Sequence, residues 1–154
     1  MEKTVLFTNE VQIKKFENEN QLFIDSTFRF HPKDYYQVFI ILADIGGGKI
    51  IFPIFHILMS NKSAYSYYTI FNHINNLIDK LKIQFSFNNC HIMIDFEHGL
   101  RDTLKKLYPK CILEGCFFHF SKALWTKSKK LGLINKKNID ITSIINMSFK
   151  NIPF

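Results

Sequence analysis

The sequence predicts an α/β domain whose mixed five-stranded sheet is flanked by helices. Three strand-like runs follow one another with only short turns between them, which is typical of an antiparallel meander. Two further strand-like runs each follow a helical pattern, so they are expected to join the sheet as parallel strands through crossover connections. With 154 residues, 47% of them hydrophobic, the chain is long enough for one domain with a substantial core.

The first three predicted strands are rich in β-branched and aromatic residues. They span Leu22–Phe30, Tyr35–Ala43 and Ile50–Leu58, and residues 1–20 before them are interpreted as a lead-in segment. The triplet Gly46-Gly47-Gly48 separates the second run from the third. We interpret it as a hairpin turn and not as a phosphate-binding loop, because it connects two strands and lacks a following Lys-Ser/Thr pair.

Helical periodicity begins after the third strand. A helix capped by Asn61 or Ser63 and ending near Leu81 carries one apolar stripe, which predicts core packing. The stripe consists of Tyr67, Ile70, Phe71, Ile74, Leu77, Ile78 and Leu81. The elements expected after it are a strand at His91–Ile94, a helix at Gly99–Tyr108, a strand at Cys111–Phe117, and helices at Phe118–Leu131 and Ile139–Phe149.

The resulting order, β-β-β-α-β-α-β-α, is that of the RNase H-like fold, in which the first and fourth strands lie side by side at the centre of the sheet. Asp25 lies on the first predicted strand and Asp95 at the end of the fourth, so the two carboxylates are expected to meet. Carboxylates that meet repel each other unless a cation neutralises them, and hard oxygen ligands select Mg²⁺ or Mn²⁺. The alternative is that both are ordinary turn or cap residues.

Four segments then resemble a known family. They are Phe23–Phe28, Phe52-Pro53 with Leu58–Lys62, Ile94–Glu97, and Gly115–Phe120 followed by Leu124-Trp125. In this order and spacing they resemble blocks of the transposases of Mutator-like elements (MULE), from about Leu6 to Leu133. The usual family form has Gly where this chain has Ser26.

The resemblance implies an Asp-Asp-Glu active site that acts with a pair of divalent ions, Mg²⁺ or Mn²⁺, on transposon ends. Asp25 and Asp95 match the first two acids and would be catalytic metal ligands. The third acid, a Glu, lies in the family beyond a helical insertion, and the only acid after Glu114 in this chain is Asp140. We therefore expect residues 21–133 to be the first part of a C-terminally truncated core and residues 134–154 to begin the insertion, so that the isolated chain is inactive.

The Cys-x-x-His motif of the family falls on Cys116 and His119. One hypothesis is half of a zinc site, with Cys90 and Cys111 as the other candidate ligands. Those two cysteines lie where predicted parallel strands begin, whereas Cys116 is five residues further along its strand, or about 16 Å at about 3.3 Å per residue. We therefore expect no zinc, and a structural or helix-positioning role for Cys116 and His119.

Polar residues around these motifs supply the remaining candidates. Glu97 is either a second-shell acid beside Asp95 or a stabilising charge at a helix N-terminus, and His98 is a candidate phosphate contact. From Gly115 onward seven lysines stand against one acid, within a net charge of +7 for the whole chain. A basic segment of this kind is either a solvated face or a contact with a polyanion. The residues expected to contact the DNA backbone are Lys122, Lys127, Lys129, Lys130 and Trp125.

These observations predict the catalytic core of a Mutator-like DNA transposase, which cleaves DNA and transfers strands at transposon ends. The alternative is a transposase-derived DNA-binding or regulatory protein without catalysis. A different RNase H-like nuclease would not explain Gly115–His119. The odd number of cysteines and the absence of a signal-peptide hydrophobic region in Met1–Glu10 indicate a reduced, intracellular protein. The resemblance implies a nuclear location and homo-oligomers of a full-length form. We expect no membrane span.

Overall fold

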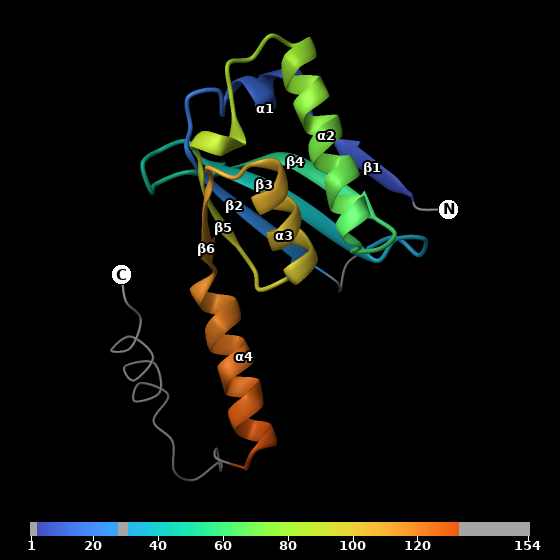
Figure 1. The fold of residues 1–154 in the computed structure, drawn as a ribbon, viewed down its shortest axis with the longest axis vertical. Coiled ribbons are helices and arrows are strands. Elements are labelled where there is room, and N and C mark those ends of the chain that lie inside the picture. Colours follow the sequence, from blue (N-terminus) through green and yellow to red (C-terminus); the bar gives the residue numbers. More distant parts are fainter. Residues whose placement is uncertain (1–2, 28–30, 133–154) are drawn as a thin grey trace. The chain divides into compact units, whose positions relative to one another are not determined.

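A computed structural model describes residues 3–27 and 31–132 of the chain (Figure 1). The chain divides into two compact units, Met1–Glu114 and Gly115–Phe154. The first unit contains the sheet and three of the described α-helices, and the second contains the helix α4. The predicted helix at Ile139–Phe149 and Asp140 within it lie outside the described residues.

The sheet has six strands in the order β1-β4-β3-β2-β5-β6 (Figure 1). Their bounds are β1 Thr4–Phe7, β2 Gln21–Thr27, β3 Gln37–Asp44, β4 Ile51–Met59, β5 His91–Ile94 and β6 Ile112–Gly115. The predicted number of five was wrong because the segment interpreted as a lead-in contributes a strand. Residues Thr4 to Phe7 pair antiparallel with β4, from Met59 to His56.

The pairing of the other strands follows the predicted meander and crossover. Strands β2, β3 and β4 are antiparallel neighbours, and β2 pairs parallel with β5. The glycine triplet lies in the turn between β3 and β4, where Gly47 and Gly48 have φ angles of +60° and +87°. An L-residue with a Cβ rarely adopts such angles, so glycine is required at both positions. The Asp44 carboxylate accepts hydrogen bonds from the backbone N–H groups of Gly46 and Gly48 and closes the turn.

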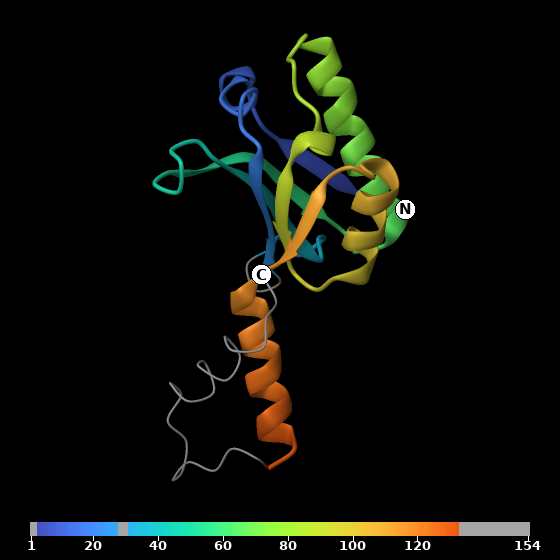
Figure 2. The ribbon, with the colours of Figure 1, turned by 60° about the vertical axis from the view of Figure 1, so that its left-hand side comes forward.

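Two helices cover one face of the sheet, α2 (Ala64–Lys80) and α3 (His98–Leu107), as Figures 1 and 2 show from two directions. The helix α2 begins at the predicted cap, where Ser63 Oγ accepts a hydrogen bond of 3.0 Å from the N–H of Ser66. The short helices α1 (Glu10–Lys14) and η1 (Phe87–Asn89) complete the first unit, and α4 spans Phe117–Lys130. Among the described helices, none is both long and apolar enough for a membrane span.

The core lies between the sheet and these helices. Aromatic rings dominate it: Phe71 and Tyr108 both pack against Phe87, with ring centroids 5.6 Å and 4.8 Å away. On the two central strands the buried residues alternate, because successive side chains of a strand point to opposite faces. Leu22 and Ile24 of β2, with Ile92 and Ile94 of β5, form the buried set under the helices. Residues between them therefore point to the opposite face of the sheet.

Candidate functional site

The parallel pairing of β2 with β5 determines where the two predicted metal ligands lie. Gln21, Leu22 and Phe23 pair with His91, Ile92 and Met93, each 70 positions later (91 − 21 = 70). Asp25 and Asp95 are separated by the same offset (95 − 25 = 70), two residues beyond the last recorded pair. Adjacent strands lie about 4.8 Å apart. If the register continues for two more residues, Asp25 lies directly beside Asp95 on the neighbouring strand.

The burial pattern indicates that the two carboxylates share a face. Leu22 and Ile24 are buried, and Ile92 and Ile94 are buried in the matching positions of β5. Asp25, which follows Ile24, is exposed, and Asp95, which follows Ile94, is half-buried. Both aspartates therefore follow a residue that points into the core, at the carboxyl end of a central strand.

The chain turns sharply after Asp95. Asp95 Oδ1 accepts a hydrogen bond of 3.1 Å from the backbone N–H of Glu97, and α3 begins at the next residue, His98, which is exposed. This short turn ties the Asp95 carboxylate to the peptide that enters α3. The orientation of Asp95 thus depends on how Glu97 is held.

Glu97 is held by a hydrogen-bond chain that comes from the core. Gln37 Nε2 donates to the hydroxyl of Tyr67 at 2.9 Å, and that hydroxyl donates to Glu97 Oε1 at 2.9 Å. Gln37 and Tyr67 are both fully buried, and Gln37 Nε2 also lies 3.1 Å from Met59 Sδ. A buried polar chain with satisfied donors fixes the groups that it connects.

The environment of Glu97 is partly desolvated. Burial raises the pKa of Glu97, and the hydrogen bond from Tyr67 and the Lys62 ammonium counteract this effect. The nearby Asp95 carboxylate raises the pKa further. Although Glu97 occupies the N-cap position of α3, its side chain forms no capping hydrogen bond. Its carboxylate accepts a hydrogen bond from Tyr67, and its backbone N–H is the group that contacts Asp95.

The donor set at this strand end fits a hard divalent cation but is incomplete. Carboxylate oxygens are the ligands that Mg²⁺ and Mn²⁺ prefer. Within residues 3–27 and 31–132, however, no three His, Cys, Asp or Glu residues come together as a metal-binding group. Asp25 and Asp95 would thus share an ion with further ligands, such as water or phosphate oxygens.

The cysteines occupy separate places in the fold. Cys90 and Cys111 directly precede β5 and β6, as the sequence predicts, and both thiols are free. Burial raises the pKa of Cys90 to about 12 and also raises that of Cys111. Cys116 is the N-cap of α4, and His119 lies in the first turn of that helix, where the backbone N–H of Phe120 bonds to the carbonyl of Cys116 at 3.0 Å.

The predicted DNA contacts lie on α4, within the second unit. One face of this helix borders a hollow of about 470 Å³, which is lined by His119, Lys122, Ala123, Thr126, Lys127 and Lys130. Lys129 lies over the ring of Trp125, with its Nζ 5.1 Å from the centroid. Three of the four predicted lysines therefore share one hollow, and the fourth is paired with the predicted aromatic residue.

Sequence reasoning missed the roles of Tyr67 and Gln37. Tyr67 was assigned to the apolar stripe of its helix, and it is buried as expected, but its hydroxyl has a partner 30 positions away in each direction. A signal for Gln37 was present in the alternation of β3: it occupies the same face as Phe39, Ile41 and Ala43, which are all buried. A polar residue at such a core position needs a hydrogen-bond partner.

Comparison with known proteins identifies one family whose model matches this chain. The family model described as the MULE transposase domain matches residues 21–123, which is more than half of the 154-residue chain. The matched range includes β2, β5 and the first part of α4. A search of curated proteins found no match.

Proposed function

This chain belongs to the MULE transposase domain family, and from that premise we propose that it supplies two metal-binding carboxylates and a DNA-binding helix to the cleavage and strand-transfer reactions of a transposase. DNA is the partner that a transposase domain implies in general. Transposon ends as the substrate, the divalent ions and a nuclear location are parts of the proposal.

The register of β2 and β5 is the observation that carries the proposal. Continued by two residues, it would bring Asp25 and Asp95 together on two neighbouring central strands, where a shared cation would neutralise their like charges. A divalent pair held there would stabilise the charge that develops on the attacking and leaving oxygens at phosphorus. Asp25 and Asp95 would hold the ions, and the Glu97 N–H would keep Asp95 Oδ1 oriented toward them.

The lysines of α4 would contribute binding and not chemistry. Lys122, Lys127 and Lys130 around one hollow present positive charge to the phosphate backbone, and such contacts carry affinity without base specificity. Lys129 and Trp125 lie together on the same helix. This division assigns metal binding to the first unit and backbone contact to the second.

A manganese titration tests the metal site. We expect the chain to bind Mn²⁺, followed by electron paramagnetic resonance of the free ion, and we expect Asp25→Asn and Asp95→Asn each to weaken binding by at least about tenfold. Because the two residues share an ion, the double variant should be little worse than either single variant. The exposed Asp34 provides a control, and Asp34→Asn should bind as the wild type does.

The same titration separates the two functional hypotheses. Loss of Mn²⁺ binding in Asp34→Asn as well, or retention in the double variant, would reject the metal site. A chain that binds DNA but no Mn²⁺ would instead support the alternative of a transposase-derived DNA-binding or regulatory protein without catalysis.

A further inference from the structure

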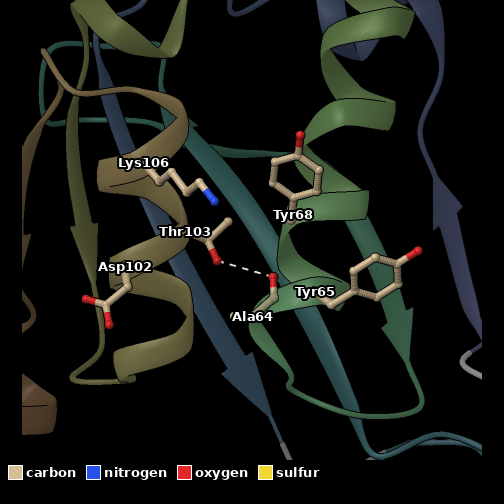
Figure 3. Close-up of a pocket in the computed structure, with 6 residues that line it drawn as sticks. All are labelled: Ala64, Tyr65, Tyr68, Asp102, Thr103 and Lys106. Atoms are coloured by element: carbon tan, nitrogen blue, oxygen red, sulfur yellow. Dashed lines mark hydrogen bonds between the residues drawn. The ribbon is translucent and has the colours of Figure 1, made fainter.

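A surface groove lies between α2 and α3 (Figure 3). Its volume is about 340 Å³, and its walls are formed by Ala64, Tyr65, Tyr68, Asp102, Thr103 and Lys106. We call it the tyrosine groove. This volume is at the low end of the range for small-molecule pockets, which suits one planar ring system and not a large ligand.

The floor of the tyrosine groove is fixed by contacts between the two helices. Thr103 is buried, and its one hydroxyl proton is shared between the carbonyl of Gly99, at 2.7 Å from Oγ1, and that of Ala64, at 3.3 Å. The start of α3 packs against the entry to α2, since a Cβ built on Gly99 would be in van der Waals contact, at 3.5 Å, with the carbonyl oxygen of Lys62. The groove is therefore preformed and needs no rearrangement to accept a ligand.

The aromatic wall of the groove is unusually open to solvent. Tyr65 and Tyr68 are 69% and 42% exposed, and they lie one helical turn apart on α2, outside its buried stripe. Within the described residues neither phenol hydroxyl takes part in a hydrogen bond. Two large rings that contribute little to the core are thus available as flat contact surfaces.

The facing wall carries a cation that is free of ion pairs. Lys106 extends from α3 toward α2, whereas the Asp102 carboxylate points away from α2 (Figure 3). Asp102 Oδ1 lies 3.5 Å from Nε of Arg101, so its charge is offset within α3. In the described part of the chain Lys106 forms no ion pair. The groove therefore combines exposed aromatic rings with one positive charge.

We propose that the tyrosine groove binds an unpaired base of single-stranded DNA. The base would stack against Tyr65 and Tyr68, and the adjacent phosphate would lie beside the Lys106 ammonium, which is the combination of aromatic platform and cation that single-strand binders use. Among the charged residues of α3, Arg101, Lys105 and Lys106 outnumber Asp102, and this local positive charge favours an anionic ligand over a proline-rich peptide, which also docks in aromatic grooves but carries no phosphate. This site goes beyond the proposed metal and backbone contacts.

Two oligomers of equal length and charge test the proposal: a labelled oligothymidine and its abasic counterpart, compared by fluorescence anisotropy without divalent ions. We expect the wild type to bind oligothymidine about tenfold more tightly than the abasic oligomer. The double variant Tyr65→Ala, Tyr68→Ala should lose this preference, and Tyr65→Phe, which keeps the ring, should retain it. Because no metal is present, the result is independent of Asp25 and Asp95.

A pair of lysine variants separates the phosphate contact from general charge. Lys106→Ala should weaken the binding of both oligomers to a similar extent, whereas Lys80→Ala, an exposed lysine at the other end of α2, should leave both unchanged. Circular dichroism of each variant checks that it is folded. Equal wild-type affinity for the two oligomers, a preference that survives in the double alanine variant, or groove occupancy by a proline-rich peptide in place of DNA would overturn the proposal.

Discussion

The hydroxyl of Tyr67 lies 2.9 Å from Oε1 of Glu97 and donates a hydrogen bond to it, although the two residues are 30 positions apart. Tyr67 is completely buried, and Glu97 is at the surface end of the turn that follows β5. The backbone N–H of Glu97 in turn bonds to Asp95. The core helix α2 is thus connected, through one hydroxyl, to a candidate metal ligand.

Removal of that hydroxyl should affect both stability and metal affinity. We expect Tyr67→Phe to lower the free energy of unfolding by about 1–3 kcal/mol, because the substitution removes the hydroxyl that hydrogen-bonds to both Gln37 and Glu97. Since Asp95 then loses part of its orientation, Mn²⁺ affinity should fall about tenfold. Urea unfolding and the manganese titration measure the two effects separately.

Tyr108 provides a matched control for this prediction. It is also a buried tyrosine, but its hydroxyl donates to Asn75 at 3.0 Å, with no bond to Glu97. Tyr108→Phe should therefore reduce stability without changing Mn²⁺ affinity. If both variants changed the metal affinity equally, or if neither did, Tyr67 would have only a structural role.

Alkaline pH should destabilise the fold through Cys90. Burial raises the pKa of this thiol to about 12, whereas an unfolded thiol has a pKa of about 8.5. Between these values the folded chain binds more protons than the unfolded one, so stability falls as the pH rises. The buried hydroxyls of Tyr67 and Tyr108, whose pKa values burial also raises, add to this loss.

The substitution Cys90→Ala isolates the contribution of the thiol. In urea unfolding from about pH 8 to about pH 10, the variant should lose stability more gradually than the wild type, by up to about 1.4 kcal/mol per pH unit. The pH slope is the readout, because the substitution also removes a buried sulfur. Identical slopes for the two proteins would show that Cys90 does not titrate as proposed.

The lysines of α4 should determine the salt dependence of DNA binding. We expect alanine substitution of Lys122, Lys127, Lys129 and Lys130 together to weaken duplex binding for every sequence tested. The slope of log affinity against log salt concentration should become shallower by up to about four units. Anisotropy titrations at several salt concentrations measure both quantities. Affinity and slope equal to those of the wild type would remove these lysines from the DNA interface.

The isolated chain should not carry out strand transfer. The described site contains two carboxylates and no third metal-binding residue beside them. Incubation with end-labelled transposon-end DNA and Mg²⁺ or Mn²⁺, followed by denaturing electrophoresis, should therefore yield no product. Efficient cleavage that is abolished by Asp25→Asn would show that two acids are sufficient.

Local patterns predicted most elements of the fold to within a few residues. The strand His91–Ile94 has the predicted bounds, and α2 has the predicted cap at Ser63 and buries the residues of its apolar stripe at Tyr67, Ile70 and Ile74. The strand Thr4–Phe7 was missed because it is short and its partner β4 is about 50 positions away. Its pairing with β4 is a long-range contact, which the periodicity of a short segment cannot predict.

The site was predictable only in part for the same reason. The order of the elements predicted that the strand of Asp25 neighbours the strand that Asp95 follows, as the pairing of β2 with β5 confirms, whereas metal binding by the two carboxylates stays a prediction. The role of the Tyr67 hydroxyl could not be predicted, because apolar spacing along a helix shows that the ring is buried but does not show which groups its oxygen contacts. The exposed Tyr65 and Tyr68 belong to no sequence pattern, and α3, which forms the other wall of their groove, lies more than thirty residues later in the chain.

The most direct test of the central claim is cleavage of the chain by iron bound in place of magnesium. Fe²⁺ with ascorbate and peroxide generates radicals that cut the backbone beside the bound ion, and mass spectrometry locates the cuts. A shared ion predicts two cuts, one at Asp25 and one at Asp95, both suppressed by excess Mg²⁺. Cuts at only one of these positions, or elsewhere in the chain, would contradict the account.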